Sequence, residues 1–301
     1  MTTSSTSTPL PTPLAPRAVL LAHAQASPTA VAAHDRGAWL ALFADGGRVD
    51  DPVGTPACCK GAHTFARTGG VDDLTRFYDC FIAPNAIRFE VHGDFVTGSA
   101  VARDVTIHVR GPTGVPTAVP AHLIYTMAGG SGGVRIARME AFWQAADVMR
   151  TVRRAGVRGV AAMMLNGWQL ARSFGFAGAR AYLRGVQDRV RSTVAREKVR
   201  ALTAALDAGD HAGVMALCEA GCDVSLPDGA RKPLARALEV DLAGCRLEVD
   251  KVLACGWNAT CSIRLRSADR QRQGLAVFEL TRSSARIRAV RLYWELDVRV
   301  S

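Results

Sequence analysis

The sequence lacks any run of eighteen or more apolar residues, so it predicts no transmembrane helix. It also lacks the basic segment and apolar stretch of a signal peptide at its start. Residues 1–16 are instead rich in serine, threonine and proline and almost uncharged, which predicts a disordered N-terminus. Apolar residues make up 49% of the chain and charged residues 21%, a balance typical of globular proteins. We therefore expect a folded, cytoplasmic protein.

Cysteines at metal-ligand spacing are also missing. The eight cysteines lie singly apart from Cys58-Cys59, and no C-x-x-C pair occurs. Cys218 and Cys222 have no second pair of cysteine or histidine ligands, and the histidines are scattered. Several cysteines fall inside apolar segments, as buried reduced thiols do. The sequence thus predicts neither a disulfide framework nor a metal site, and we expect no cofactor.

Positive charge is in clear excess. The net charge is +10, and arginines are concentrated between Arg150 and Arg200, where acidic residues are few. Aromatic residues are sparse in this segment and no recognised nucleic-acid-binding motif is present, so we expect no nucleic-acid partner. A solvated helical face and a surface that contacts anionic lipid are both consistent with such a run.

The first half of the chain predicts helices followed by strands. Apolar residues recur at three- and four-residue spacing in 18–33 and 37–43, and 72–82 is typical of a further helix. Four strands separated by Gly/Pro turns are predicted at residues 87–92, 100–110, 118–127 and 134–143. This order predicts an α+β fold, with helices packed on one face of a curved antiparallel sheet.

The second half repeats this order at a spacing of roughly 150 residues. Helices are predicted at residues 199–206 and 211–218, and strands at residues 245–254, 259–266, 275–281 and 287–295. Both halves close on similar segments, RIARMEAFW (135–143) and RIRAVRLYW (286–294). We therefore predict two domains of the same kind, residues 17–146 and 198–301, joined by a basic helical linker at 147–197.

The first half resembles a known family. The segments WLALFAD (39–45) and RVDDPVG (48–54), Gly61, Phe77-Tyr78 and MEAFW (139–143) are similar to those of ketosteroid isomerases and SnoaL-like cyclases. These proteins belong to the nuclear transport factor 2-like superfamily, whose members have unrelated functions. The resemblance implies two cone-shaped α+β domains, the second of them a degenerate copy.

Asp51, directly before Pro52, falls on the catalytic base of this family. In the family the base moves a proton next to a ketone, beside an oxyanion hole formed by a tyrosine and a protonated aspartic acid. Here the tyrosine position falls near Ser27 and the acid position on Tyr125, whose phenol is able to donate to an enolate oxygen. Aspartate before proline is also a common turn residue, and tyrosine is common at the edge of a core. The sequence leaves both interpretations open.

Strand alternation adds to the predicted site. Leu123, Tyr125 and Met127 share one face of their strand, whereas His122 and Ile124 point to the other face. The resemblance implies that the residues around Asp51 and Tyr125 are core or pocket wall. The predicted substrate-binding set is Ser27, Trp39, Phe77, Tyr78, Leu123, Met127, Met139 and Trp143.

The second copy lacks the catalytic groups. When 217–225 is aligned on 43–51, Ser225 takes the position of Asp51, and Phe278 takes that of Tyr125. The resemblance implies that the two copies pair through their sheets as an intramolecular pseudo-dimer.

The leading hypothesis is a cofactor-independent, ketosteroid-isomerase-like isomerase or cyclase that moves a proton on a hydrophobic carbonyl compound of steroid or polyketide type. One alternative is an epoxide hydrolase or polyether-type cyclase, which needs a second carboxylate, such as Asp79 or Asp104, beside Asp51. The other is a non-catalytic binder of a lipophilic metabolite, with the basic linker as a membrane or partner contact.

Overall fold

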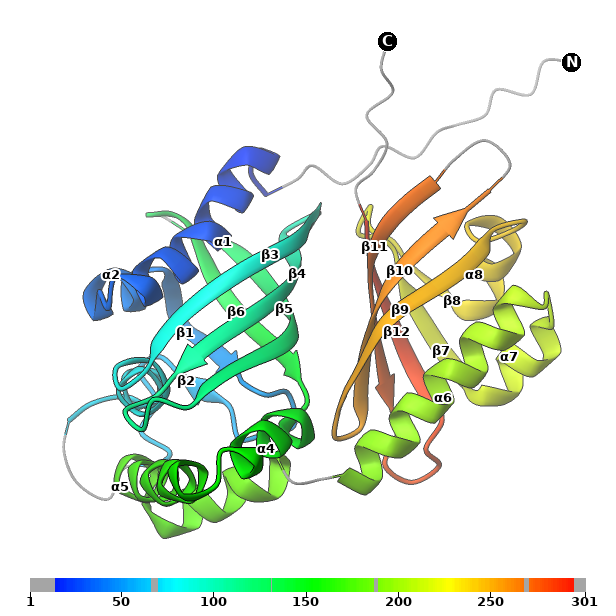
Figure 1. The fold of residues 1–301 in the computed structure, drawn as a ribbon. Coiled ribbons are helices and arrows are strands. Elements are labelled where there is room, and N and C mark those ends of the chain that lie inside the picture. Colours follow the sequence, from blue (N-terminus) through cyan, green and yellow to red (C-terminus); the bar gives the residue numbers. More distant parts are fainter. Residues whose placement is uncertain (1–13, 66–69, 131, 187–188, 268–270, 295–301) are drawn as a thin grey trace, which may run out of the picture.

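The computed structural model describes residues 14–65, 70–130, 132–186, 189–267 and 271–294, and within them the chain forms two six-stranded sheets flanked by helices (Figure 1). The predicted α+β class with two domains is confirmed. Residues 1–13, predicted to be disordered, and residues 295–301 of the predicted second domain lie outside the described residues.

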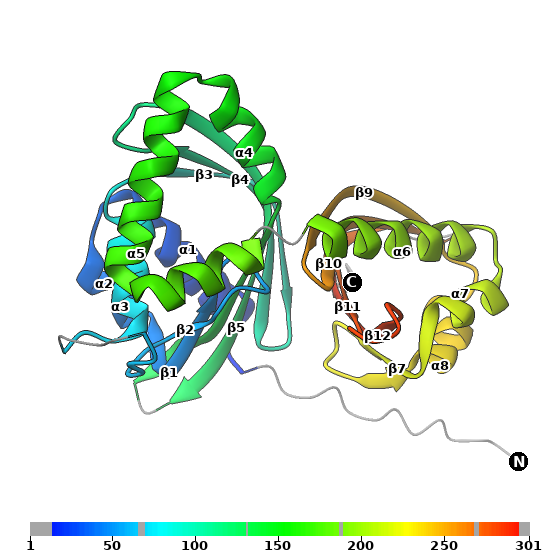
Figure 2. The same ribbon diagram turned by 90° about the horizontal axis from the view of Figure 1, so that it is seen from below.

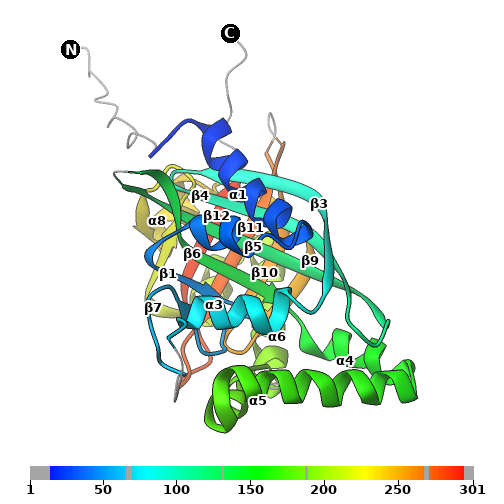
Figure 3. The same ribbon diagram turned by 90° about the vertical axis from the view of Figure 1, so that its left-hand side faces the viewer.

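The first domain places three short helical segments on one face of its sheet. Its elements are α1 (Arg17–Ala32), α2 (Arg36–Ala41), β1 (Phe43–Asp50), β2 (Cys58–Cys59), α3 (Asp73–Phe77), the π-helix η1 (Tyr78–Ile82), β3 (Ala86–Thr97), β4 (Ala100–Arg110), β5 (Pro116–Gly130) and β6 (Gly133–Trp143). The strand order is β2-β1-β6-β5-β4-β3, and within it β1 and β6 are parallel. Helices α1, α2 and α3 lie on the face turned away from the second domain (Figure 3).

The second domain repeats this topology. Its elements are α6 (Arg189–Asp207), α7 (His211–Leu217), β7 (Cys218–Ser225), β8 (Arg231–Pro233), α8 (Leu234–Val240), β9 (Arg246–Cys255), β10 (Asn258–Arg266), β11 (Gln271–Leu280) and β12 (Ile287–Trp294). The strand order β8-β7-β12-β11-β10-β9 matches that of the first domain, with the same parallel pair between the first strand and the last.

The two domains also share the break between their first helices. His34 and Gly209 both have a positive φ, 54° and 68°. The aspartate that follows, Asp35 or Asp210, then accepts a hydrogen bond from the amide three residues later, at 2.8 Å in both domains. Such a cap satisfies an amide that has no partner inside the helix. The duplication predicted from the sequence is therefore visible in the local geometry.

The strand register corrects one alignment between the copies. Asp50 and Ser225 are the last residues of β1 and β7, and they occupy the same place in the parallel ladder with the closing strand. The predicted match of Ser225 with Asp51 is therefore wrong by one residue. The alignment by sequence set Leu217 against Phe43, whereas the first residue of β7, which corresponds to Phe43, is Cys218. Leu226 takes the position of Asp51, so an apolar side chain replaces the base.

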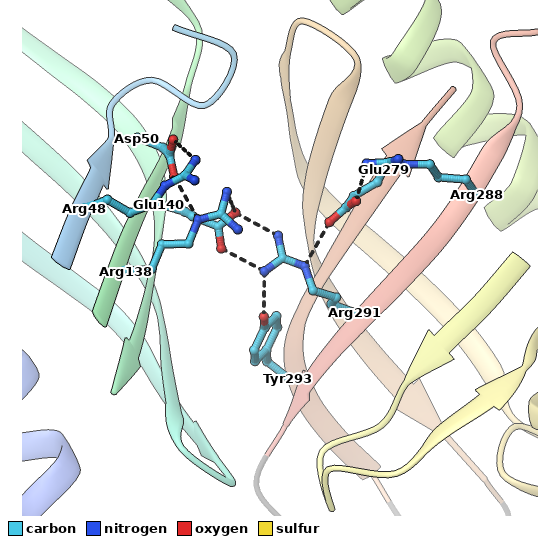
Figure 4. A network of polar contacts seen from close by, with 8 residues as sticks. All are labelled: Arg48, Asp50, Arg138, Glu140, Glu279, Arg288, Arg291 and Tyr293. Carbon is cyan, nitrogen blue, oxygen red and sulfur yellow. Dashed lines mark hydrogen bonds and ion pairs between the residues drawn. The ribbon is translucent and has the colours of Figure 1, made fainter. Parts of the chain in front are cut away.

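The two sheets pack against each other through their helix-free faces (Figure 1). An apolar cluster joins them, formed by Val53, Ala102, Ile124, Phe142, Cys255, Leu275, Val277 and Tyr293. Beside it the carboxylate of Glu140, which is 2% exposed, accepts two hydrogen bonds from Arg291 at 2.8 and 3.0 Å (Figure 4). The predicted pairing of the two copies through their sheets is confirmed.

The predicted basic linker is divided between the domains. Helices α4 (Ala145–Arg154) and α5 (Val157–Val186) lie against the first domain, with Leu170, Phe174 and Ala179 in its core. Helix α5 bends at Gly175, which has φ 68° and ψ 171°. Helix α6 begins inside the predicted linker and buries Ala195 of that segment in the core of the second domain. The basic segment is therefore a structural part of both domains.

The Glu140–Arg291 pair predicts a large cost for removing the cation alone. The variant Arg291→Gln leaves a buried carboxylate with only the flanking Arg138, and we expect it to lower the free energy of unfolding by roughly 2–4 kcal/mol in urea titrations. The double variant Glu140→Gln/Arg291→Gln should recover part of this loss, because no charge remains buried. A loss no greater than that of the exposed Arg236→Gln control would contradict this prediction.

Candidate active site

Asp51 follows β1 directly and lies where the first sheet meets α5. Its carboxylate accepts a hydrogen bond of 2.5 Å from Nε1 of Trp143, the last residue of β6. Its neighbour Asp50 faces the other way, and its carboxylate binds the guanidinium groups of Arg48 and Arg138 (Figure 4). The two adjacent aspartates therefore differ in their partners: one is held in an ion-pair network, and the other by a neutral indole.

Burial raises the pKa of the Asp51 carboxyl to about 6, and the hydrogen bond from Trp143 offsets part of that rise. The residue as a whole is only partly buried. A carboxyl group with a pKa near neutrality is able both to remove a proton and to return it.

Tyr182 on α5 covers Asp51 from the other side. Its hydroxyl donates to the main-chain oxygen of Asp51 at 2.9 Å, and its ring stacks on Phe81 with the centroids 5.0 Å apart. Burial and the negative charge of Asp51 raise the pKa of this phenol well above its usual value. At Gly185 a Cβ atom would lie 2.7 Å from the main-chain oxygen of Gly54, so only glycine allows α5 this close to the Asp51 loop.

Tyr182 is a functional candidate that the sequence analysis missed. The spacing of Leu170 and Phe174 indicates an inward face of α5, but the helix bends at Gly175 before Tyr182. Which domain that face meets depends on packing between distant segments, for which the sequence contains no local signal.

Tyr125 and Ser27 lie together in the interior of the first domain. Tyr125 is 1% exposed, and the side chain of Ser27 lies close enough to lower the pKa of its hydroxyl. Ser27 also accepts a hydrogen bond from Nε1 of Trp39 at 3.2 Å. Burial raises the pKa of Tyr125, so at neutral pH it is a neutral phenol that is able to donate.

The other predicted substrate-binding residues form one cluster with Tyr125. Trp39 packs against Phe77 and Tyr78, with ring centroids 6.0 and 5.6 Å apart. Leu123, Met127 and Met139 are buried in the same cluster, and Trp143 packs on its edge. His122 and Ile124 point to the opposite face, as predicted, and contact the second domain. The structure thus brings the predicted set together on the inner side of the sheet.

Two surface hollows lie elsewhere. One, of about 470 Å³, is formed by the ends of β3, β4 and β5, and the other, of about 340 Å³, lies on α4. Neither is lined by Asp51 or Tyr125. Tyr182 lies beside Asp51, with its hydroxyl on the main-chain oxygen of that residue.

The two acids considered as a second catalytic carboxylate do not join Asp51. Asp104 lies in the domain interface, where it binds the ammonium of Lys251 and the hydroxyl of Ser262. Asp79 forms an exposed ion pair with Arg36 at 3.1 Å. An epoxide-opening mechanism with either residue beside Asp51 is not supported.

The described residues contain no group of three or more His, Cys, Asp or Glu side chains placed to hold a metal ion. All eight cysteines are free thiols. None of the described helices combines the length and the apolar character that crossing a membrane requires.

Residues 24–139 match the family model of the SnoaL-like domain. The match covers the first domain from α1 to Met139, and therefore includes Asp51 and Tyr125 but neither α5 nor the second domain. The resemblance predicted for the first domain is confirmed. No curated protein matches the chain.

Solved structures with similarity to the chain align over about one domain. A Mycobacterium tuberculosis protein in complex with estradiol-17β-hemisuccinate is 25% identical, over 42% of this chain and 95% of its own, with a TM-score of 0.34. The Δ5-3-ketosteroid isomerase from Mycobacterium sp. is 26% identical over the same shares, with a TM-score of 0.34. An epoxide hydrolase/cyclase-like enzyme of pyran ring formation in salinomycin is 16% identical, over 43% of this chain and 94% of its own, with a TM-score of 0.35.

The hydrogen bond from Trp143 predicts the direction of a pKa change at Asp51. A bond to a charged group contributes about 1.5–3 kcal/mol, and one pKa unit corresponds to about 1.4 kcal/mol. The variant Trp143→Phe should therefore raise the Asp51 pKa from about 6 by a further unit or so, measured by carbon-13 NMR titration of the carboxyl.

Trp294, the last residue of β12, is the matched control. Its Nε1 has no hydrogen-bond partner among the described residues, so Trp294→Phe should leave the Asp51 titration unchanged. An Asp51 pKa that stays the same or falls in Trp143→Phe would contradict the assignment.

Proposed function

We propose that the first domain, which is SnoaL-like over residues 24–139, is an intramolecular isomerase or cyclase that moves a proton on a hydrophobic carbonyl compound of steroid or polyketide type. The observation that carries the proposal is the Asp51 carboxyl, with its pKa raised to about 6 and no cation bound to it among the described residues. The chemistry is proton transfer and needs no cofactor.

Asp51 acts as the base. Above about pH 6 it is ionised, and its desolvated carboxylate removes the acidic proton next to the substrate carbonyl. The protonated carboxyl that results then returns the proton at another carbon of the conjugated system. A pKa close to the working pH serves both steps.

Tyr125 acts as the donor to the enolate oxygen that forms when the proton leaves. Its phenol is neutral and buried, and a hydrogen bond to developing negative charge is strong where water is excluded. Ser27 lies beside the hydroxyl in the free protein. Ser27, Trp39, Phe77, Tyr78, Leu123, Met127, Met139 and Trp143 line the path and provide apolar binding surface.

Asp51→Asn separates this function from simple binding. We expect α-proton exchange of a hydrophobic β,γ-unsaturated ketone in D₂O, followed by NMR, to fall roughly 10²–10⁴-fold. In the parent protein, kcat/KM should rise with pH and level off above about pH 6, because the base must be ionised. The exposed Asp45→Asn, on the same strand, is the control and should keep full activity.

The same variant should be more stable than the parent. The pKa of Asp51 is higher in the folded chain than its ordinary value of 3.8, so the folded state holds the proton more tightly and the parent loses stability as pH rises from about 4 to about 6. Asparagine removes this cost, and the free energy of unfolding at neutral pH should rise by about 1–3 kcal/mol.

α-Proton exchange by Asp51→Asn that stays within a few-fold of the parent rate would contradict the assignment of Asp51 as the base. A bound ketone that neither protein turns over, held equally by both, would instead support the binder.

Tyr125→Phe tests the donor. Loss of a hydrogen bond that forms fully only in the transition state should lower kcat by about 10²–10³-fold with little change in KM. Tyr293→Phe is the control, because it removes a buried phenol hydroxyl in the cluster between the two sheets, outside the proposed substrate-binding set. Equal effects of the two substitutions would show that Tyr125 is only a core residue.

A further inference from the structure

Helices α4 and α5 lie on the outside of the first domain (Figure 2), and their sequence is strongly basic. Between residues 145 and 186 the only acidic residue is Asp147. The arginines of this segment are all exposed, and they are Arg150, Arg153, Arg154, Arg158, Arg172, Arg180 and Arg184. This short segment therefore accounts for more than half of the net charge of +10.

The same surface presents an apolar stripe. Val157, Val160, Met164 and Trp168 follow one another at three- and four-residue spacing, which places them on one face of α5. Their exposed fractions are 86% for Val157, 52% for Val160, 72% for Met164 and 56% for Trp168. The face that contacts the core carries Leu170 and Phe174 instead. The first half of α5 is thus apolar on its outer face as well as its inner one.

The second half of α5 continues this pattern after the bend. Phe176 is 89% exposed and Leu183 is 42% exposed, with arginines nearby in the sequence. The guanidinium of Arg172 lies 5.2 Å from the centre of the Trp168 ring, so the two side chains shield part of each other from water.

A hollow of about 340 Å³ on α4 gathers three of the arginines. It is lined by Ala146, Arg150, Arg153 and Arg154. Arg150 forms an exposed ion pair with Asp147, whereas Arg153 and Arg154 have no carboxylate partner in the part of the chain that the structure describes. The hollow therefore lacks the negative charge that would balance it, and it has room for a phosphate group.

We propose that α4 and α5 bind the surface of a membrane that contains anionic phospholipids. The stripe Val157, Val160, Met164 and Trp168 enters the boundary between head groups and acyl chains, and the arginine hollow on α4 binds lipid phosphate. A helix that lies in the plane of the interface in this way needs an apolar face flanked by cations, and its binding strength grows with both.

The combination of features favours lipid over other anionic partners. Nucleic acids are bound by cations and by aromatic rings that stack on bases, and exposed valine and methionine side chains serve neither purpose. An apolar stripe of this kind on a water-facing helix is costly unless something covers it. A lipid interface satisfies the stripe and the arginines at the same time.

Flotation of the full chain with vesicles tests the proposal. We expect the protein to float with phosphatidylcholine vesicles that contain phosphatidylserine, to float much less with phosphatidylcholine alone, and to be released as salt is raised. The variant Arg150→Gln/Arg153→Gln/Arg154→Gln should weaken binding by roughly fivefold for each arginine removed. Met164→Gln/Trp168→Gln should weaken it at least about tenfold, because the inserted apolar area is lost.

Removal of the same charge elsewhere is the matched control. Arg231→Gln/Arg236→Gln/Arg246→Gln changes three exposed arginines of the second domain and should retain most of the binding. Equal binding to neutral and anionic vesicles, or an equal loss in both triple variants, would overturn the proposal. Sedimentation velocity gives a further check: a dimer that the Met164/Trp168 variant abolishes would show that a second copy of the chain covers the stripe instead.

Discussion

The packing of the two sheets against each other is the contact on which the rest of the structure depends. Because successive residues of a strand point to opposite faces, a sheet buried on both sides gives neighbouring residues different surroundings. Asp50 faces the polar edge of the interface, where Arg48 and Arg138 bind it, and Glu140 beside it is neutralised by Arg291 of the other domain. Asp51 faces the helix-covered side and is left with an indole. Arg48, Arg138 and Arg291 thus bind carboxylates on the interface side of the sheet, while Asp51 on the other side has no arginine partner among the described residues and keeps a raised pKa.

The second domain is best understood as the support of this arrangement. It repeats the topology of the first, yet Leu226 takes the place of Asp51 and Phe278 takes that of Tyr125, so the inner side carries neither base nor donor. What it does contribute is the face that covers the first sheet. Fusion of two copies makes this pairing intramolecular, so the partner is present at a high effective concentration.

Much of the fold was predictable because its signals are local. Alternation of apolar residues and Gly/Pro turns each depend on a few neighbouring residues, and every strand predicted from them overlaps a strand of the structure. The ends differ most at β3, which continues to Thr97 beyond the predicted 87–92, and at β11, which begins at Gln271 before the predicted 275–281. The same alternation placed Tyr125 inside and His122 outside. Two features needed the folded chain. The predicted alignment of Ser225 with Asp51 was wrong because the register of β7 is determined by its hydrogen bonds to β12, which is distant in the sequence. Tyr182 was missed because only tertiary packing brings α5 onto the Asp51 loop.

Helix α5 links the two proposals by its geometry. Its inner side carries Leu170, Phe174 and, past the bend, Tyr182 on the Asp51 main chain, while its outer side presents the apolar stripe and the arginines. The arginines are exposed and therefore screened by water and salt, so they do not lower the pKa of Asp51, for which desolvation outweighs every favourable contact. A hydrophobic substrate concentrates in a membrane, and the helix proposed to bind that membrane is also the one that packs on the Asp51 loop. The bend at Gly175 separates the half of α5 that carries the apolar stripe from the half that carries Tyr182, so movement of one half need not disturb the other.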